Sequence, residues 1–470
     1  MEPTVNTSQE EQARLTGIIE VDAELVDDIS SLIETGQQGM VLNILTDLHP
    51  ADLASIVAHL SKDLARQAVE WLPAEAAGEV MAELDDDFRA DIADDIPHER
   101  LTAMIDELDT DDAVDVLADL PAEVVEQIIP ELEDAEDVKE LLTYDEESAG
   151  GLMATEFVAV PGDYTVAQAT EEVRLNANAV EELFVLFVTD EGERLKGIVT
   201  MKRLLLSRAG TQIWDIMNDD IISVTTDVDQ EDVARLMERY DLVTLPVLDE
   251  EGLLVGRITI DDIVDVIRDE AEEDIQRMSG VAGGEEATDS VVRIMRGRLP
   301  WLLVGLAGAS LAALVIISFE ESLAAASILA GFIPIVMATA GNAGIQSSAI
   351  AVQGLASGDI WASDIKKRLG KELSVALLNG VVASVVLGIG ILIFGMAFSS
   401  RVPNPTELAY TASIALMIVI VLATTIGAMT PLFLDKAGID PAIATGPFIT
   451  TSNDILGILV FFLLAEWLYL

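Results

Sequence analysis

Residues 442–465, AIATGPFITTSNDILGILVFFLLA, form an apolar stretch long enough to cross a membrane, with one ionisable side chain, Asp454, near its middle. A membrane-spanning helix needs about 20 predominantly apolar residues. Four similar stretches precede it, at residues 301–319, 323–355, 373–398 and 408–434. The sequence therefore predicts a membrane domain of five helices over residues 300–470. The second stretch is longer than one span needs and contains Pro334, which predicts a kink or a break.

Basic residues are concentrated on one side of the five predicted helices. The loops on that side carry Arg293, Arg296, Arg298, Lys366, Lys367, Arg368, Lys371 and Lys436. The loops on the other side carry Glu320, Glu321, Arg401 and Glu407. Because loops rich in Lys and Arg stay in the cytoplasm, we expect a cell-membrane protein with its N-terminal half inside and its C-terminus outside. An odd number of spans requires the same outcome.

Asp454 stands in this apolar setting without a basic partner. None of the predicted spans contains Lys, Arg or His, and an ionisable group at that depth costs roughly 2.5–3.5 kcal/mol on insertion scales. A partly hydrated cation is the natural partner, and a protonated structural acid is the alternative. Helical spacing also predicts a polar face in each of two spans, which either lines a pore or hydrogen bonds between helices. The two faces consist of Thr339, Asn342, Gln346 and Gln353, and of Thr450, Asn453, Asp454 and Gly457.

The residue types near Asp454 favour a hard divalent cation. The spans contain no His and the chain contains no Cys, which leaves oxygen ligands. One carboxylate per chain is few for dehydrated Ca²⁺, whereas Mg²⁺ is commonly held by one or two carboxylates and several waters. Two chains on a two-fold axis would supply two copies of Asp454, so we expect a homodimer. Spacing alone leaves Mn²⁺ and other divalent ions open.

The acidic residues are concentrated ahead of the predicted membrane domain. Residues 291–470 contain 9 Lys and Arg against 10 Asp and Glu, so nearly all of the net charge of −57 lies in residues 1–290. Nucleic-acid binding needs a basic footprint and is not expected. A halophilic surface explains most of this excess, because the acids occur in every polar stretch. Only acids clustered at particular positions therefore support a role in sensing cations.

A repeat of 12 residues follows a polar tail predicted for residues 1–24. Its repeated positions are Leu48, Leu60, Leu72, Leu84, Ile96, Leu108, Leu120 and Leu132. Turn and helix-start signals such as LPAEA and IPHER follow many of them, and proline suits the first helical turn. Each unit therefore predicts one short helix and a turn. The sequence predicts an all-α helical-repeat domain over residues 25–149.

A different pattern, β-α-β-β-α, occurs twice over residues 150–278. The first copy contains FVAV, TVAQATEEVRL and LFVLFVTDEGERLKGIVTMKRLL, and the second contains IISV, DQEDVARLMERY and LVTLPVLDEEGLLVGRITIDDIV. Met153 and Met217 open the two copies. This doubled unit resembles a tandem pair of CBS modules, which implies an α+β fold. A glycine-rich linker, SGVAGGEE, then leads to the segment DSVVRIMRGR and the first span.

The whole order of segments resembles the MgtE family of magnesium channels. The most specific matches are PIVMATAGNAGIQSSA at residues 334–349 and DPAIATGPFITTSNDILG at residues 440–457, although Ala340 stands where the family usually has glycine. The resemblance implies that Asp454 selects the ion, that Thr450 assists from the preceding turn, and that Asp440 lies near the cytosolic mouth. It also implies a plug helix, which we assign to residues 279–299.

The family resemblance further implies a cytosolic sensor for Mg²⁺. The acidic segment DDIVDVIRDEAEEDI, residues 261–275, is similar to the family's gate segment. Carried over by position, the sensor carboxylates are Asp262, Asp265, Glu270, Glu273 and Asp274, with Glu231 and Asp241 earlier in the module. Mg²⁺ would bridge the acidic domains and close the pore. A CBS-regulated transporter of another divalent cation, such as Mn²⁺ or Co²⁺, is the alternative.

CBS pairs often bind adenine nucleotides, and Thr259 and Asp262 form a Thr-x-x-Asp arrangement suited to a ribose. ATP is therefore a candidate ligand, although this role for Asp262 competes with the sensor role. An anion channel is not expected, because the spans lack basic residues. An enzyme is not expected either, because the sequence has no phosphate loop, nucleophile elbow or metal-binding His pair. A membrane receptor without transport stays open as a third class.

Overall fold

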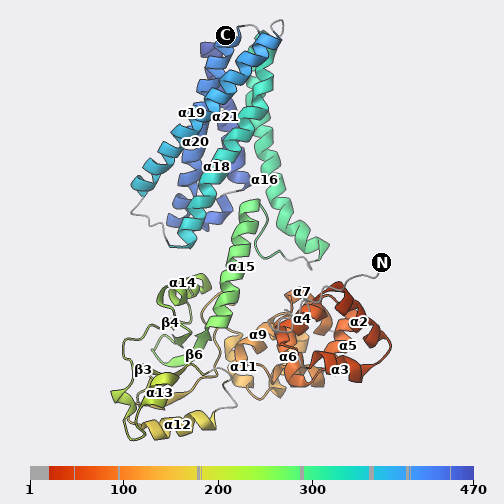
Figure 1. The fold of residues 1–470 in the computed structure, drawn as a ribbon, viewed down its shortest axis with the longest axis vertical. Coiled ribbons are helices and arrows are strands. Elements are labelled where there is room, and N and C mark those ends of the chain that lie inside the picture. Colours follow the sequence, from red (N-terminus) through yellow and green to blue (C-terminus); the bar gives the residue numbers. More distant parts are fainter. Residues whose placement is uncertain are drawn as a thin grey trace, which may run out of the picture. The chain divides into compact units, whose positions relative to one another are not determined.

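The computed structural model describes residues 21–46, 48–93, 96–176, 180, 183–285, 290–358, 365–398, 402, 404–444 and 446–470. Most of the predicted polar tail lies outside the described residues. The chain divides into two compact units, Met1–Ile267 and Arg268–Leu470, and the division falls inside helix α15 (Ile260–Ser279). Figure 1 labels the helices and strands of both units.

The first unit begins with short helices that follow the 12-residue repeat. Each helix from α4 to α10 starts two residues after a repeat position, and Leu60, Leu72 and Leu84 are buried between the helices. Most helices pack against the next but one along the chain, as α4 does against α6. This arrangement confirms the predicted helical-repeat domain. The helices are α2 (Ala23–Glu34), α3 (Gln38–Leu45), α4 (Pro50–Ala58), α5 (Lys62–Trp71), α6 (Ala74–Ala82), α7 (Asp86–Ala93), α8 (His98–Ile105), α9 (Thr110–Ala118), α10 (Ala122–Ile128), η1 (Ile129–Glu131) and α11 (Ala135–Leu141).

The first unit continues with two modules that contain one three-stranded sheet each. The first module has the strand order β1-β2-β3, with β1 parallel to β2 and β2 antiparallel to β3, and the second repeats this pattern as β4-β5-β6. This repetition confirms the predicted doubled unit. The elements are β1 (Ala159–Pro161), α12 (Val166–Leu175), β2 (Val185–Thr189), β3 (Leu195–Thr200), α13 (Met201–Leu206), η2 (Ile213–Asp215), β4 (Val224–Thr225), α14 (Gln230–Tyr240), β5 (Thr244–Leu248), β6 (Leu254–Thr259) and α15.

The two modules exchange their opening segments. Ala154 pairs with Arg257 of β6, and Asn218 pairs with Ile198 of β3, so each opening segment extends the sheet of the other module. The two opening methionines follow the same rule. A Cβ on Gly256 would lie 2.7 Å from the Met153 sulfur, and one on Gly197 would lie 2.6 Å from the Met217 sulfur. Glycine is therefore required at both places, and the exchange joins the modules.

The second unit contains five helices long and apolar enough to cross a membrane, which confirms the five predicted spans. The predicted break in the second span is also confirmed, because Pro334 stands in the first turn of α18 and the 3₁₀ helix η3 precedes it. Helices α18, α20 and α21 pack together, α19 packs on α20, and α16 packs on α21. The elements are α16 (Val291–Ser318), α17 (Glu320–Ala325), η3 (Ser327–Phe332), α18 (Ile333–Ala356), α19 (Ile365–Ala397), α20 (Pro405–Lys436), η5 (Pro441–Ala444) and α21 (Pro447–Leu468).

The separate linker helix predicted over residues 279–299 is wrong. Helix α15 ends at Ser279, and Gly280 follows with a φ of 79°, a left-handed conformation that glycine adopts readily. Residues 291–298 are instead the first turns of α16, whose N-cap Ser290 accepts a hydrogen bond from the Arg293 amide at 3.3 Å. The apolar span is therefore the continuation of this amphipathic segment.

Candidate functional site

A cavity of about 590 Å³ lies in the second unit, beside the start of α21. This volume falls in the usual range for ligand sites, roughly 300–1,000 Å³. Its walls come from α16, α18 and α21, and Met278 and Ser279 contribute the end of α15. From the membrane helices the lining includes Gly305, Gly308, Ala309, Ile345, Thr450, Thr451 and Asp454.

Asp454 lines this cavity from the third turn of α21 and has no side-chain partner. Among the described residues, its carboxylate makes no hydrogen bond or ion pair. Gly341 of α18 lies behind it, because a Cβ there would be 4.0 Å from Asp454 Oδ1 and 3.4 Å from the methyl carbon of Thr450. The hydroxyl of Thr450 donates to the Gly446 carbonyl at 3.1 Å. Thr450 and Asp454 are thus brought together on one wall of the cavity.

The other residues predicted to share that face do not line this cavity. Asn453 is 2% exposed and packs on Gly344, and Gly457 packs against Val419 and α18. Neither amide atom of the Asn453 side chain has a hydrogen-bond partner within the described structure. The face that α21 turns to the cavity carries Thr450, Thr451 and Asp454, and the neighbouring helices cover the adjacent sector. For Asn453 and Gly457, pore lining therefore stays a prediction, since neither lines this cavity.

The polar face predicted for α18 is also displaced from the cavity. Asn342 and Gln346 have exposed side chains, while Ile345 lines the cavity in their place. Because successive helical residues are rotated by about 100°, Gly341 and Ile345 share one stripe and Asn342 and Gln346 share the next. A pore role for Asn342 and Gln346 stays a prediction that depends on a second copy of the chain.

The end of α15 lies against the beginning of α21. A Cβ on Gly446 would be 2.9 Å from the Met278 carbonyl oxygen, and one on Gly280 would be 2.7 Å from the Pro447 ring. Arg277, in the last turn of α15, forms ion pairs with both Glu273 and Asp440. Asp440 also caps η5 by accepting a hydrogen bond from the Ala442 amide at 2.7 Å. The acidic helix itself, and not the segment after the glycine linker, therefore reaches the cavity.

A group of carboxylates in the first unit lies where α9 meets the start of α15. Burial, followed by the charges of Asp262 and Asp115, raises the pKa of Asp112 to about 7. Burial raises the pKa of Asp262 to about 6, although hydrogen bonds from Thr259 oppose the increase. The pKa of Asp111 also lies well above its usual range because of burial and the charge of Asp262. These acids repel one another, so protons or cations would stabilise the arrangement.

Helix α9 is held against the CBS-like modules by other contacts. The Thr110 hydroxyl donates to Glu156 Oε2 at 2.9 Å, and the Thr155 amide donates to the Thr110 hydroxyl at 2.9 Å. Arg257, only 5% exposed, lies 3.5 Å from Asp109. The acids of α9 are thus brought to Asp262 by a docking surface that does not itself need an ion. No group of three Asp, Glu or His side chains among the described residues forms a ready metal site.

Family models match three parts of this chain. The MgtE model, described as a divalent cation transporter, matches residues 333–464, the MgtE intracellular N domain matches 48–147, and the CBS domain matches 149–210 and 213–269. The magnesium transporter MgtE of Enterococcus faecalis is 35% identical over 333 residues, which cover 71% of this chain and 72% of that protein. The chain belongs to the MgtE family. The magnesium transporter MgtE of Thermus thermophilus is 31% identical, again over 71% of this chain and 72% of that protein.

Membership in the MgtE family confirms the resemblance drawn from residues 334–349 and 440–457. It places this chain in a family of multi-pass membrane transporters, and the relatives that it matches are magnesium transporters. A solved structure titled as the cytosolic domain of the Mg²⁺ channel MgtE in complex with ATP is 34% identical, with a TM-score of 0.49. The match covers 51% of this chain and 99% of the chain in the solved structure.

The predicted sensor residues of this MgtE protein fall at separate places. Asp262 joins the α9 acids, and Glu273 lies in the α15 turn that reaches Asp440. Glu231 pairs with Arg235 at the start of α14, while Asp241 is the left-handed residue that ends the same helix. Ten residues of helix separate these two by about 15 Å, so a single chain does not bring them together. The three other predicted sensor acids lie on α15. Asp265 is exposed, and Glu270 and Asp274 are half-buried.

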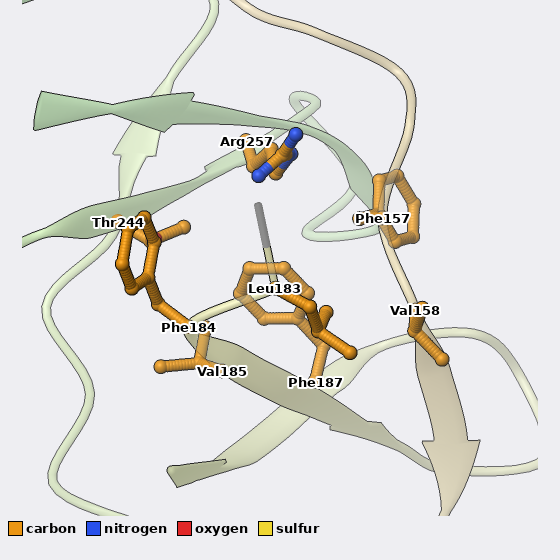
Figure 2. Close-up of a pocket in the computed structure, with 8 residues that line it drawn as sticks. All are labelled: Phe157, Val158, Leu183, Phe184, Val185, Phe187, Thr244 and Arg257. Carbon is orange, nitrogen blue, oxygen red and sulfur yellow. The ribbon is translucent and has the colours of Figure 1, made fainter. Parts of the chain in front are cut away.

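A second, tightly filled pocket lies between the two CBS sheets, and its cavity volume is about 0 Å³, because side chains leave no room for a water molecule. Figure 2 shows Arg257 on one side and the rings of Phe157, Phe184 and Phe187 among the surrounding side chains. Thr259 and Asp262 do not line it; both the amide and the hydroxyl of Thr259 donate to Asp262, at 3.1 and 2.8 Å. Ordinary ligand sites have volumes of roughly 300–1,000 Å³, so this pocket is closed to a nucleotide as it stands. The ribose role of Thr259 and Asp262 therefore stays a prediction.

The sequence analysis did not identify Asp111, Asp112 and Asp115 as partners of Asp262. Their signal is present in LDTDD at residues 108–112, where two acids stand in the first turn of a helix. From the sequence alone, these acids could not be distinguished from the many other acids of the repeat domain. Only the docking of α9 against the start of α15 distinguishes them.

Proposed function

We propose that this protein is a Mg²⁺-selective channel whose cytosolic Mg²⁺ sensor closes it when the ion is abundant. The observation that carries the proposal is Asp454, a carboxylate without a cationic side-chain partner that lines a cavity between membrane helices. The end of the acid-rich helix α15 contributes to the same cavity. An ion site and an element that can respond to the ion thus share one wall.

The chemistry of the cavity supports a hydrated Mg²⁺ as the transported ion. Asp454, Thr450 and Thr451 supply one carboxylate and two hydroxyl oxygens. This set is too small to replace the whole hydration shell of Ca²⁺, which takes 6–8 oxygen ligands. Mg²⁺ retains most of its waters and needs few direct ligands. Another divalent cation such as Mn²⁺ or Co²⁺ is the second candidate, because it accepts the same oxygen ligands.

A homodimer in the cell membrane is part of the proposal. A second copy would double the Asp454 carboxylates on a two-fold axis and would cover the exposed Asn342 and Gln346. The loops rich in Lys and Arg support an orientation with the N-terminal unit in the cytoplasm and the C-terminus outside.

Gating is proposed to arise at two acidic places, one in each unit. Mg²⁺ would bind where α9 meets Asp262 and where α15 meets Asp440, and would relieve the repulsion between their carboxylates. A ligand shifts such an equilibrium only by its different affinity for the two states. If the cell is salt-rich, as the acidic surface suggests, the Debye length falls to about 3 Å at 1 M. Direct coordination must then control the gate.

An adenine nucleotide such as ATP is proposed as a further ligand of the CBS pair. Its support is chemical: the cavity of Figure 2 combines the buried Arg257 guanidinium with several aromatic rings, and arginine suits phosphate. Enlargement of this cavity would be required. Binding of labelled ATP to the purified protein, compared with Arg257→Gln, tests this part separately.

The experiment that tests the proposed function is Mg²⁺ uptake into liposomes that contain the purified full-length protein. We expect Asp454→Ala to lose most of the uptake, while the matched control Asp435→Ala, an exposed acid at the end of α20, retains it. Competition with Mn²⁺ and Co²⁺ in the same liposomes decides between the candidate ions. Equal uptake by wild type and Asp454→Ala would remove Asp454 from the ion path.

A further inference from the structure

Arg277 joins the end of α15 to the entrance of α21. Its guanidinium contacts Glu273 one helical turn earlier and Asp440 just before η5, through different nitrogen atoms. The side chains of Arg277, Glu273 and Asp440 are 31%, 22% and 27% exposed, so all three are mostly shielded from water. Partly buried contacts of this kind are less weakened by salt than contacts on an open surface.

The position of this contact relates it to the cavity. The next residues after Arg277 are Met278 and Ser279, which line the cavity, and Gly280, which lies against Pro447. Pro447 stands one turn before Thr450 and two turns before Asp454 in α21. The Arg277 contact therefore fixes the part of α15 that contributes to the cavity wall.

A second attachment holds the same turn of α15 from the side of α16. The Gln276 side chain donates to the Glu285 carbonyl at 2.7 Å and accepts from its amide at 2.8 Å. The Glu285 carboxylate in turn accepts from Arg298 Nε of α16, at 2.9 and 3.0 Å. The linker thus ties α15 to α16, whereas the ion pair of Arg277 with Asp440 ties α15 to the η5–α21 segment.

The charges at this contact make Arg277 equivalent to a resident cation. Glu273 and Asp440 carry two negative charges, and without a cation between them they would repel each other and separate α15 from α21. The guanidinium supplies one positive charge that does not depend on the ion concentration, because arginine stays protonated. A contact that holds α15 at the cavity is therefore present before any divalent ion binds.

We propose that Arg277 is a tethered cation that keeps the end of α15 at the cavity through Asp440 and supplies an ion-independent part of channel closure. This inference rests on the proposed gating function. In this proposal, Arg277 helps to determine the internal Mg²⁺ concentration at which the channel closes. With this contact in place, less Mg²⁺ is needed to complete closure.

The test measures Mg²⁺ uptake by the full-length protein in liposomes over a range of internal Mg²⁺. We expect Arg277→Gln to keep full uptake at low internal Mg²⁺ and to raise the half-inhibiting concentration about 5-fold or more, the lower end of ordinary allosteric effects. Arg277→Lys, which keeps the charge but loses the planar fork, should give a smaller shift. The matched control is Arg268→Gln, an exposed arginine of the same helix paired with Asp269.

The outcomes separate this inference from the proposed function. If wild type takes up no Mg²⁺, or internal Mg²⁺ does not inhibit it, the proposed function itself fails. If wild type is inhibited and Arg277→Gln has an unchanged half-inhibiting concentration, only the tether is overturned. A lower half-inhibiting concentration in Arg277→Gln also overturns it, because Arg277 would then compete with the ion instead of supporting closure.

Discussion

In the second unit a single carboxylate, Asp454, lines a cavity between apolar helices, whereas in the first unit Asp111, Asp112 and Asp262 lie close together where α9 meets α15. The isolated acid has a fixed environment and can meet one ion at a time. The clustered acids destabilise one another until protons or cations neutralise them. The same side-chain chemistry therefore suits ion selection in one place and ion sensing in the other.

The largest expected effect follows from filling the space beside the isolated acid. Gly341→Ala should be tolerated, because its Cβ would make only ordinary contacts with Thr450 and Asp454. Gly341→Leu should abolish Mg²⁺ uptake, since its branched end would occupy the space next to the carboxylate. Gly331→Leu, at a position with no atoms within 4 Å of a Cβ, is the control. Normal uptake by Gly341→Leu would contradict the place given to Asp454.

An intermediate effect is expected from neutralising the clustered acids. The double variant Asp112→Asn and Asp262→Asn relieves the repulsion without an ion, so uptake at low internal Mg²⁺ should fall toward the inhibited level. The ratio of uptake at low and high internal Mg²⁺ should shrink about 5-fold or more. Glu250→Gln with Glu251→Gln, exposed acids in the β5–β6 turn, removes the same charge as a control. A wild-type ratio in the Asn variant would exclude this cluster from the sensor.

The smallest expected effect is a dependence on internal pH. The folded-state pKa values of Asp262 and Asp112, about 6 and about 7, lie above the unfolded value of about 3.9. The docked arrangement is therefore fully stabilised only below pH 4 and loses stability as the pH rises from about 4 to 7. Lowering the internal pH from 8 to 6 should reduce uptake at low internal Mg²⁺ by a few-fold, as Mg²⁺ does. The double Asn variant should show a smaller response, because only Asp111 and Asp115 of the cluster can still titrate; a response of the same size would place the titrating group elsewhere.

Much of the fold could be predicted from local patterns, because the 12-residue leucine repeat and the apolar spans each determine their own elements. The break in the second span was also predictable, because Pro334 marks it in the sequence. The linker helix was not, although Ser290 is an ordinary helix N-cap that could have indicated where α16 begins. Apolar length alone does not show that a span continues an amphipathic segment.

The candidate site was predicted only in part. Thr450 and Asp454 lie on the cavity because they share a helix face, but periodicity alone could not show that Asn453 and Gly457 would face α18 and α20. That choice depends on close approaches between helices, such as Gly344 against both Gly427 and Asn453. The partners of Asp262 were likewise set by the docking of α9. In both units, tertiary contacts selected a few polar residues from many equivalent ones.

The accessibility of residue 454 from water tests the central claim most directly. The chain contains no cysteine, so Asp454→Cys introduces a single thiol whose reaction with a small, positively charged thiol reagent can be measured in liposomes. We predict rapid modification of Asp454→Cys that Mg²⁺ slows, and no modification of Ile458→Cys, which is one turn further along α21 and fully buried. A cysteine at position 454 as unreactive as that at 458 would contradict the account, because the carboxylate would then not face an aqueous path.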